Sequence, residues 1–114
     1  MLKPDVLRKK KDFSLLYSKG KSNGGKYVVL FFRKNDLPYN RKAFLASKKV
    51  GKSVDRNRAR RLMRESYRNI EKYLPKGYDI LFIARNTISR EGIKCADVEK
   101  SIKHLINKSE LFSG

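Results

Sequence analysis

The stretch between positions 48 and 68 concentrates side chains that could bind another molecule, because nine of its residues are lysine or arginine and only two are acidic. At about 100° per residue, the side chains of Asn57, Arg61, Arg64 and Arg68 fall on one side of a helix. Arginines three or four positions apart stand roughly 5–6 Å from one another, close to the spacing of phosphates along a nucleic-acid strand. A guanidinium can also donate two hydrogen bonds to one phosphate. The pattern therefore predicts a surface that binds a sugar-phosphate backbone.

An ordinary solvated helix face is the alternative interpretation of this stretch. Such faces usually alternate positive and negative residues four positions apart, whereas Glu65 is nearly alone here. The whole chain favours the binding interpretation, because it has 29 basic and 11 acidic residues, a net charge of +18 and a pI near 10.3. A chain of this charge repels itself unless a polyanion compensates. Nucleic acid is the favoured partner, and an anionic membrane surface is the competing one.

The remaining chemistry-bearing residues form no catalytic or metal-binding set in the sequence. The acidic residues are scattered, the single Cys95 excludes an intrachain disulfide, and one cysteine with one histidine, His104, leaves no zinc site of the usual kind. No metal ligands are therefore predicted in this chain. There is no run of about 18 apolar residues and no signal segment, so we expect a soluble cytoplasmic protein with no membrane contact.

The elements that must position the basic residues form a single domain over residues 1–114, because the length supports one core and no composition break divides it. The predicted order is a helix within residues 1–18, a turn at 21–25, strands at 26–33 and 41–47, a helix at about 54–74, a strand at 78–84 and a helix at 97–107. That order predicts an α/β sandwich, in which helices pack on a small sheet.

The apolar faces of the two later helices can be assigned by their periodicity. The core-facing residues are predicted to be Ala59, Leu62, Met63, Ser66, Ile70 and Leu74 in the first of these helices, and Val98, Ile102, Leu105 and Ile106 in the last. The strand at 78–84 is nearly all apolar, so we expect it to be central and covered on both faces.

Aromatic residues near the N-terminus have two possible roles. In the strand at 26–33, alternation places Tyr27, Val29 and Phe31 on one face, which could form a groove with Phe13 and Tyr17 of the first helix. Aromatic side chains beside basic ones commonly hold unpaired nucleotides. Aromatic residues at this spacing also commonly belong to a core, and the pattern alone leaves both roles open.

Residues 47–65, SKKVGKSVDRNRARRLMRE, resemble the signature of the bacterial ribonuclease P protein component, whose hallmark Arg-Asn-Arg element is seen here as Arg56, Asn57 and Arg58. The resemblance covers nearly the whole chain in the expected order. It includes KDFSLLYSKG in the first helix, FLASKK before the basic loop, GYDILFIAR in the following strand and SIKHL in the last helix.

The resemblance implies a specific fold of the α/β (α+β) class. This fold is a two-layer sandwich with a small mixed sheet, the order α-β-β-β-α-β-α and a left-handed βαβ crossover. It resembles the second domain of a small-subunit ribosomal protein. A left-handed crossover opposes the usual right-handed preference, so periodicity alone does not suggest it.

The resemblance also implies a function, that of the protein subunit of ribonuclease P. Such a subunit joins a catalytic RNA, expected at one protein per RNA, and the complex removes the 5′ leader of precursor tRNA by Mg²⁺-dependent endonucleolytic cleavage. The catalytic centre and the Mg²⁺ are expected mainly in the RNA.

Two groups of residues acquire expected roles from this resemblance. Those expected to bind the RNA subunit are Lys48, Lys49, Lys52, Arg56, Asn57, Arg58, Arg60, Arg61, Arg64 and Arg68. The cleft for the single-stranded leader is expected to contain Phe13, Tyr17 and Phe31. Two alternatives remain: a structural RNA-binding protein, similar to a ribosomal protein, with no role in cleavage, and a DNA-binding regulator that prefers duplex ligands.

Overall fold

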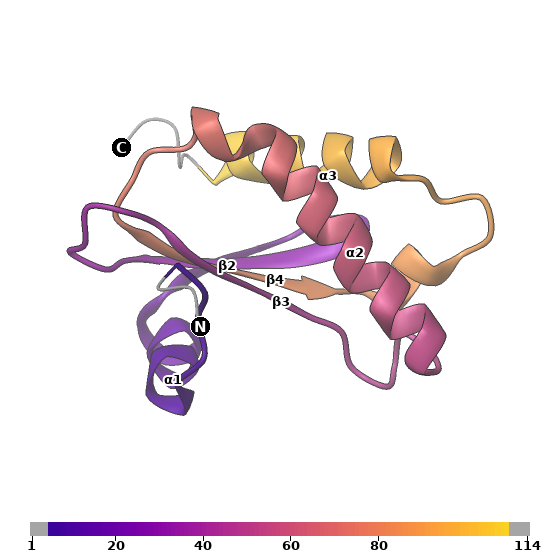
Figure 1. The fold of residues 1–114 in the computed structure, drawn as a ribbon, viewed down its shortest axis with the longest axis horizontal. Coiled ribbons are helices and arrows are strands. Elements are labelled where there is room, and N and C mark those ends of the chain that lie inside the picture. Colours follow the sequence, from indigo (N-terminus) through magenta and orange to yellow (C-terminus); the bar gives the residue numbers. More distant parts are fainter. Residues whose placement is uncertain (1–4, 110–114) are drawn as a thin grey trace.

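The computed structural model describes residues 5–109, which form a four-stranded sheet with three α-helices (Figure 1). The elements are α1 (Lys10–Lys19), β1 (Lys21–Gly24), β2 (Val28–Lys34), β3 (Arg41–Leu45), α2 (Ser53–Ile70), η1 (Glu71–Tyr73), β4 (Tyr78–Ala84), η2 (Asn86–Ser89) and α3 (Cys95–Lys108), where η marks a short 3₁₀ helix. Helices α2 and α3 cover one face of the sheet, and α1 lies on the other. The predicted sandwich of helices on a small sheet is confirmed.

The sheet is mixed, with the strand order β1-β2-β4-β3. Strand β4 pairs antiparallel with β2 and parallel with β3, and β1 pairs antiparallel with β2. The middle residues of β4, Ile80, Leu81 and Phe82, are fully buried, so the prediction of a central strand covered on both faces is also confirmed.

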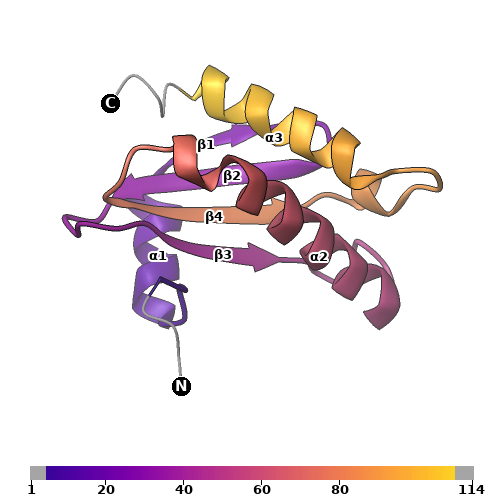
Figure 2. The same cartoon turned by 45° about the horizontal axis from the view of Figure 1, so that its top comes forward.

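The connection from β3 through α2 to β4 joins two parallel strands. In Figure 2, α2 lies in front of the sheet, both strands point to the right and the chain rises from β3 to β4, which is a left-handed crossover. Most such connections are right-handed, because a twisted strand followed by a right-handed helix packs back on the sheet most easily that way. The left-handed path is therefore a property that the family resemblance predicts and that local patterns do not.

Two apolar clusters hold these layers together. The larger lies between the sheet and α2 with α3, and it contains every residue that the helical periodicity assigned to the core except Ser66, which is buried beside it. The smaller lies under α1 and contains Leu7, Leu16, Ala43 and Leu81, with Phe31 packed against it. Alternate residues of β2, β3 and β4 face the two clusters, because successive side chains of a strand point to opposite faces of the sheet.

The prediction of a turn at residues 21–25 is wrong, because Lys21–Gly24 form β1. This edge strand is polar and mostly exposed, and its backbone pairs with β2, so it has none of the hydrophobic alternation that reveals a strand in a sequence. The turn is confined to the next residues, where the Gly25 N–H donates to the Val28 carbonyl at 2.8 Å. Tyr27 consequently precedes β2 and is buried in the larger cluster, not on the face that Phe31 occupies.

Candidate RNA interface

The basic face of α2 is exposed along its length. Asn57, Arg61, Arg64 and Arg68 are all exposed, while the opposite side of the helix is buried against the sheet and α3. None of these three arginines forms a salt bridge with a described residue. The predicted arginine row therefore exists as a solvent-facing surface with donors free for an anion.

The loop before α2 is fixed by two residues. Gly51 has a φ of +144°, which L side chains rarely adopt, and a Cβ there would lie 2.4 Å from an oxygen of Asp55. Asp55 Oδ2 in turn accepts the Lys52 backbone N–H at 3.1 Å, which satisfies a donor at the start of the helix. Lys48, Lys49 and Lys52 are exposed in or next to this loop and extend the positive surface.

The residues of the Arg-Asn-Arg element differ in what they contact. Arg56 Nη2 donates to Ser53 Oγ at 3.1 Å, and the exposed Asn57 accepts a hydrogen bond from Arg60 Nη2 at 3.0 Å. Arg58 is half-buried, and its guanidinium donates to the carbonyl of Ile93 in the loop that precedes α3. Arg58 thus connects α2 to the loop before α3. The sequence does not distinguish Arg58 from its basic neighbours in this respect.

The three predicted leader-binding residues come together on the α1 side of the sheet. The rings of Tyr17 and Phe31 are 5.2 Å apart between centroids and nearly perpendicular, and Phe13 and Phe31 both pack on the smaller cluster. Tyr17 is 49% exposed, whereas Phe13 and Phe31 are half-buried. Part of the same sheet face is uncovered, because Val29 and Ile83 are only half-buried. The aromatic residues therefore serve both the cluster and the surface.

A groove of about 490 Å³ lies beside β3, between Phe13 of α1 and the arginine row of α2, and Tyr17 and Phe31 do not line it. Its walls include Phe13 from α1, Ala43 and Leu45 from β3, and Arg64 and Arg68 from α2. No sequence pattern indicates this groove, because Ala43, Phe44 and Leu45 form a continuous apolar run and show no alternation. The groove can accept a ligand that presents both an apolar ring and negative charge.

Tyr67 forms part of the same groove from the buried side of α2. Burial raises the pKa of the Tyr67 phenol well above its ordinary value, and the neighbouring Glu71 carboxylate raises it further. Lys42 lies 6.0 Å over the Tyr67 ring and pairs with Glu71 at 3.4 Å and with Asp5 at 2.6 Å. The floor of the groove thus contains a neutral phenol beside a paired lysine, and it offers no activated nucleophile.

Within residues 5–109, no three His, Cys, Asp or Glu side chains gather in a way that could hold a metal ion. No helix in the described part of the chain is both long and apolar enough to span a bilayer.

Comparison with known proteins places this geometry in a family. The family model described as Ribonuclease P matches residues 1–110. The ribonuclease P protein component of Clostridioides difficile is 44% identical over 92% of this chain and 91% of its own length.

Two solved structures are similar to the whole fold. The ribonuclease P protein of Staphylococcus aureus has a TM-score of 0.84 with 26% identity, covering 96% of this chain and 99% of that one. The ribonuclease P protein of Thermotoga maritima has a TM-score of 0.81 with 34% identity, covering 90% of this chain and 96% of that one. The chain therefore belongs to the ribonuclease P family, as a protein component of this tRNA-processing endoribonuclease.

Proposed function

We propose that the chain binds the catalytic RNA of ribonuclease P through α2 and its preceding loop, and binds the 5′ leader of precursor tRNA through the aromatic face of α1 and β2. The observation that carries this proposal is the groove in which Phe13 faces Arg64 and Arg68 across β3. Aromatic rings beside guanidinium groups suit single-stranded nucleotides, whose bases stack while their phosphates bind arginine.

The RNA-subunit surface is assigned to the exposed part of the basic stretch. Within residues 5–109, Arg61, Arg64 and Arg68 form no salt bridge. A row of such guanidinium groups, continued by exposed lysines in the loop, suits a folded RNA backbone more than a small anion. Arg58 has a mixed role in this proposal, because its hydrogen bond to Ile93 occupies part of its guanidinium.

The leader surface is assigned to Phe13, Tyr17 and Phe31. Tyr17 presents a ring that is half exposed and is held in place by its edge contact with Phe31. Stacking of a base on such a ring is worth about 1–3 kcal/mol and depends little on which base it is. Because mature tRNA lacks the leader, this contact favours precursor over product.

The chain contributes charge and position to catalysis, while the RNA holds the catalytic Mg²⁺ in this proposal. Catalytic RNA and precursor tRNA are both polyanions, so their association is opposed by repulsion that Mg²⁺ must relieve. A protein of net charge +18 replaces part of that ion requirement with fixed positive charge. We expect one protein per RNA, acting in the cytoplasm.

The proposal is tested with purified protein, a bacterial ribonuclease P RNA and 5′-labelled precursor tRNA at low Mg²⁺. The variant Arg61→Ala/Arg64→Ala/Arg68→Ala is compared with the control Lys94→Ala/Lys100→Ala/Lys108→Ala, which removes the same charge from exposed positions in or beside α3. Wild type and control should restore cleavage at the mature 5′ end at similar protein concentrations. The arginine variant should need roughly 100-fold more protein, because each bond from arginine to phosphate is worth about 1 kcal/mol or more.

Two results would count against the proposal. If the protein binds the RNA without changing cleavage, the structural RNA-binding alternative replaces it. If the two triple variants lose activity equally, overall charge matters and the α2 face does not. The salt dependence of binding separates these cases further, because the slope of log K against log salt should decrease by roughly 0.7–0.9 for each phosphate that the arginine variant no longer neutralises.

A further inference from the structure

The three α-helices of the described chain each have an aspartate at the third position of the first turn, but only two use it in the same way. In α2, Asp55 Oδ2 accepts the Lys52 N–H at 3.1 Å, and in α3, Asp97 Oδ2 accepts the Lys94 N–H at 2.9 Å. Each bond satisfies a backbone donor that the helix leaves without a partner. In α1 the corresponding carboxylate, that of Asp12, makes no capping bond.

The Asp12 carboxylate faces the sheet instead and meets Arg41 at the start of β3. Arg41 Nη1 and Nη2 each lie 3.4 Å from an Asp12 oxygen. The same guanidinium donates to Asp79 on β4, from Nε to Oδ1 at 2.8 Å and from Nη2 to Oδ2 at 2.7 Å. Asp79 is only 3% exposed, and Asn35 Nδ2 donates to its Oδ1 at 2.9 Å. A continuous set of polar contacts therefore runs from the beginning of β4 through Arg41 to α1.

These contacts stabilise the charged form of the Arg41 guanidinium. The hydrogen bond to Asp79 raises the pKa of Arg41, and the charges of Asp79 and Asp12 add to the effect against the desolvation of the guanidinium. Arg41 and Asp79 are also register partners in the parallel pair of β3 and β4. The Nε and Nη2 edge of the planar Arg41 guanidinium is therefore held by Asp79. This fixes the direction in which Nη1 and Nη2 donate to Asp12.

Among the described residues, the two bonds that Asp12 accepts from Arg41 are the only side-chain hydrogen bonds that join α1 to the sheet. The other contacts of α1 with the sheet are apolar, with Leu16 completely buried beneath the helix. Apolar packing is non-directional, whereas hydrogen bonds have preferred angles. The bond to Asp12 can therefore fix the rotation of α1 about its axis, which packing on Leu16 alone does not.

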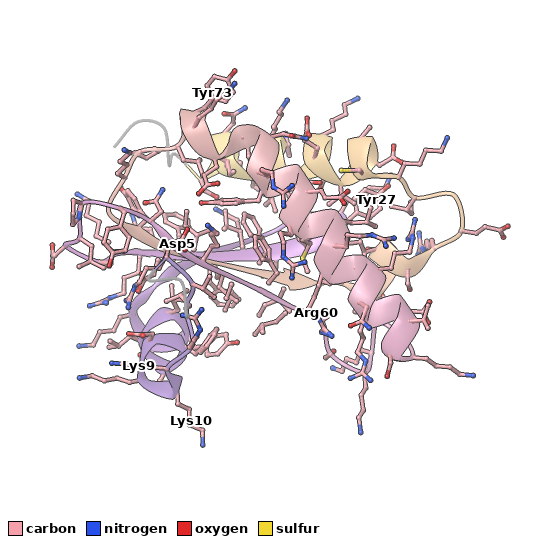
Figure 3. The ribbon with its side chains drawn as sticks, viewed as in Figure 1. Asp5, Lys9, Lys10, Tyr27, Arg60 and Tyr73 are labelled. Carbon is pink, nitrogen blue, oxygen red and sulfur yellow. The ribbon has the colours of Figure 1, made fainter. Side chains whose placement is uncertain are left out.

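The arrangement is unfavourable for α1 as an isolated helix. Its first turn lacks the cap that α2 and α3 have, and Lys10 and Lys11 place positive charge where the helix dipole disfavours it. Figure 3 shows Lys9 and Lys10 at the end of α1, on the side of the sheet opposite α2. The contact of Asp12 with Arg41 is therefore better explained by the placement of α1 on the sheet than by the stability of the helix itself.

We propose that Arg41 and Asp12 are positioning residues that set the rotation of α1 over the sheet, so that Phe13 and Tyr17 meet the leader in fixed register with Phe31. Phe13 and Tyr17 belong to the same helix as Asp12, so a rotation of α1 released at Asp12 displaces both rings. This inference rests on the proposed leader-binding function and adds to it the residues that hold the leader-binding surface in place.

The test compares Asp12→Asn with Asp97→Asn, which makes the same charge change at the same position of α3. Both proteins are reconstituted with a bacterial ribonuclease P RNA. The measurement is the ratio of the affinities for precursor tRNA and for leaderless mature tRNA. Asp12→Asn should lower this ratio roughly fivefold, while affinity for the catalytic RNA and the cleavage rate of bound precursor stay within about twofold. Asp97→Asn should leave the ratio at the wild-type value.

The removal of a negative charge by Asp12→Asn should by itself strengthen RNA binding, which is opposite to the expected loss of leader affinity. Both substitutions make the protein more positive, which increases the affinity for any RNA. A loss of leader affinity in Asp12→Asn therefore cannot come from electrostatics at long range. Arg41→Lys keeps the charge but cannot serve both carboxylates in the same geometry, and it should lower the ratio in the same direction.

Three outcomes overturn the inference, and they have different consequences. If Asp12→Asn and Arg41→Lys both keep the wild-type ratio while Tyr17→Ala lowers it, the leader-binding proposal stands and the positioning role is wrong. If Tyr17→Ala also leaves the ratio at the wild-type value, the leader-binding proposal and the positioning role are both wrong. If Asp12→Asn weakens binding of the catalytic RNA as much as it lowers the ratio, Asp12 has a general structural role. Thermal unfolding of each variant shows whether it is folded.

Discussion

The ring of Tyr17 meets that of Phe31 edge to face, with centroids 5.2 Å apart and planes at 86°. This arrangement is favourable for aromatic quadrupoles, and it fixes Tyr17 without covering it. Because Tyr17 belongs to α1 and Phe31 to β2, the pair exists only when α1 is packed on the sheet. The ring of Tyr17 is therefore exposed and held in a fixed orientation.

Replacing Tyr17 with alanine should lower the affinity of the reconstituted enzyme for precursor tRNA by about tenfold, because the ring on which a base stacks is removed. Affinity for leaderless tRNA should not change, which equilibrium binding of the two ligands measures. Tyr73→Ala is the matched control, because Tyr73 is 64% exposed and Figure 3 places it beyond the end of α2 and away from α1. Equal losses in the two variants would contradict the assignment of Tyr17.

Substitutions at Arg58 and Arg61 should have different effects on the free energy of unfolding and on the affinity for the catalytic RNA. Arg58→Met leaves the Ile93 carbonyl without its guanidinium donor, so the free energy of unfolding should decrease by about 1–3 kcal/mol. Arg61→Met removes an exposed side chain, and the change in stability should be within about 0.5 kcal/mol while affinity for the catalytic RNA decreases. Urea unfolding and RNA binding measure the two effects. Equal stability of the two variants would show that the Arg58 bond is unimportant.

The stability of the protein should decrease in alkaline solution partly through Tyr67. The phenol has a raised pKa in the folded state, so above about pH 10 the unfolded chain loses a proton that the folded chain keeps. The stabilising contribution is complete below pH 10 and is lost progressively as pH rises toward the folded-state pKa. Tyr67→Phe should flatten the dependence of unfolding free energy on pH between about 9 and 11, measured by denaturant unfolding. Parallel curves for the two proteins would rule out this contribution.

The parts of the structure that follow from helical periodicity could be predicted from the sequence. Ala59, Leu62 and Met63 are buried and Arg61 and Arg64 are exposed, because a helix of this length has one apolar side whatever it packs against. The strand at Tyr78–Ala84 was also predictable, because a short apolar run bounded by glycine and a polar segment has few other solutions.

The remaining features depend on contacts that a local pattern does not contain. Strand β1 exists because its backbone pairs with β2, and its side chains carry no sign of this pairing. Arg58 resembles its basic neighbours in the sequence, and only the position of Ile93 in the fold makes it a structural residue. Asp12 occupies the same helix position as Asp55 and Asp97, yet Arg41 on a distant strand determines its different partner.

The strand order places the formation of the sheet late in synthesis. Strands β2 and β3 both pair with β4 in the described sheet and not with each other, so neither is complete until Ala84 has left the ribosome. Helix α2 precedes β4 in the chain, and its arginines emerge before the surface beneath them has formed. A nascent chain of this protein therefore presents its most basic segment while it is still unfolded.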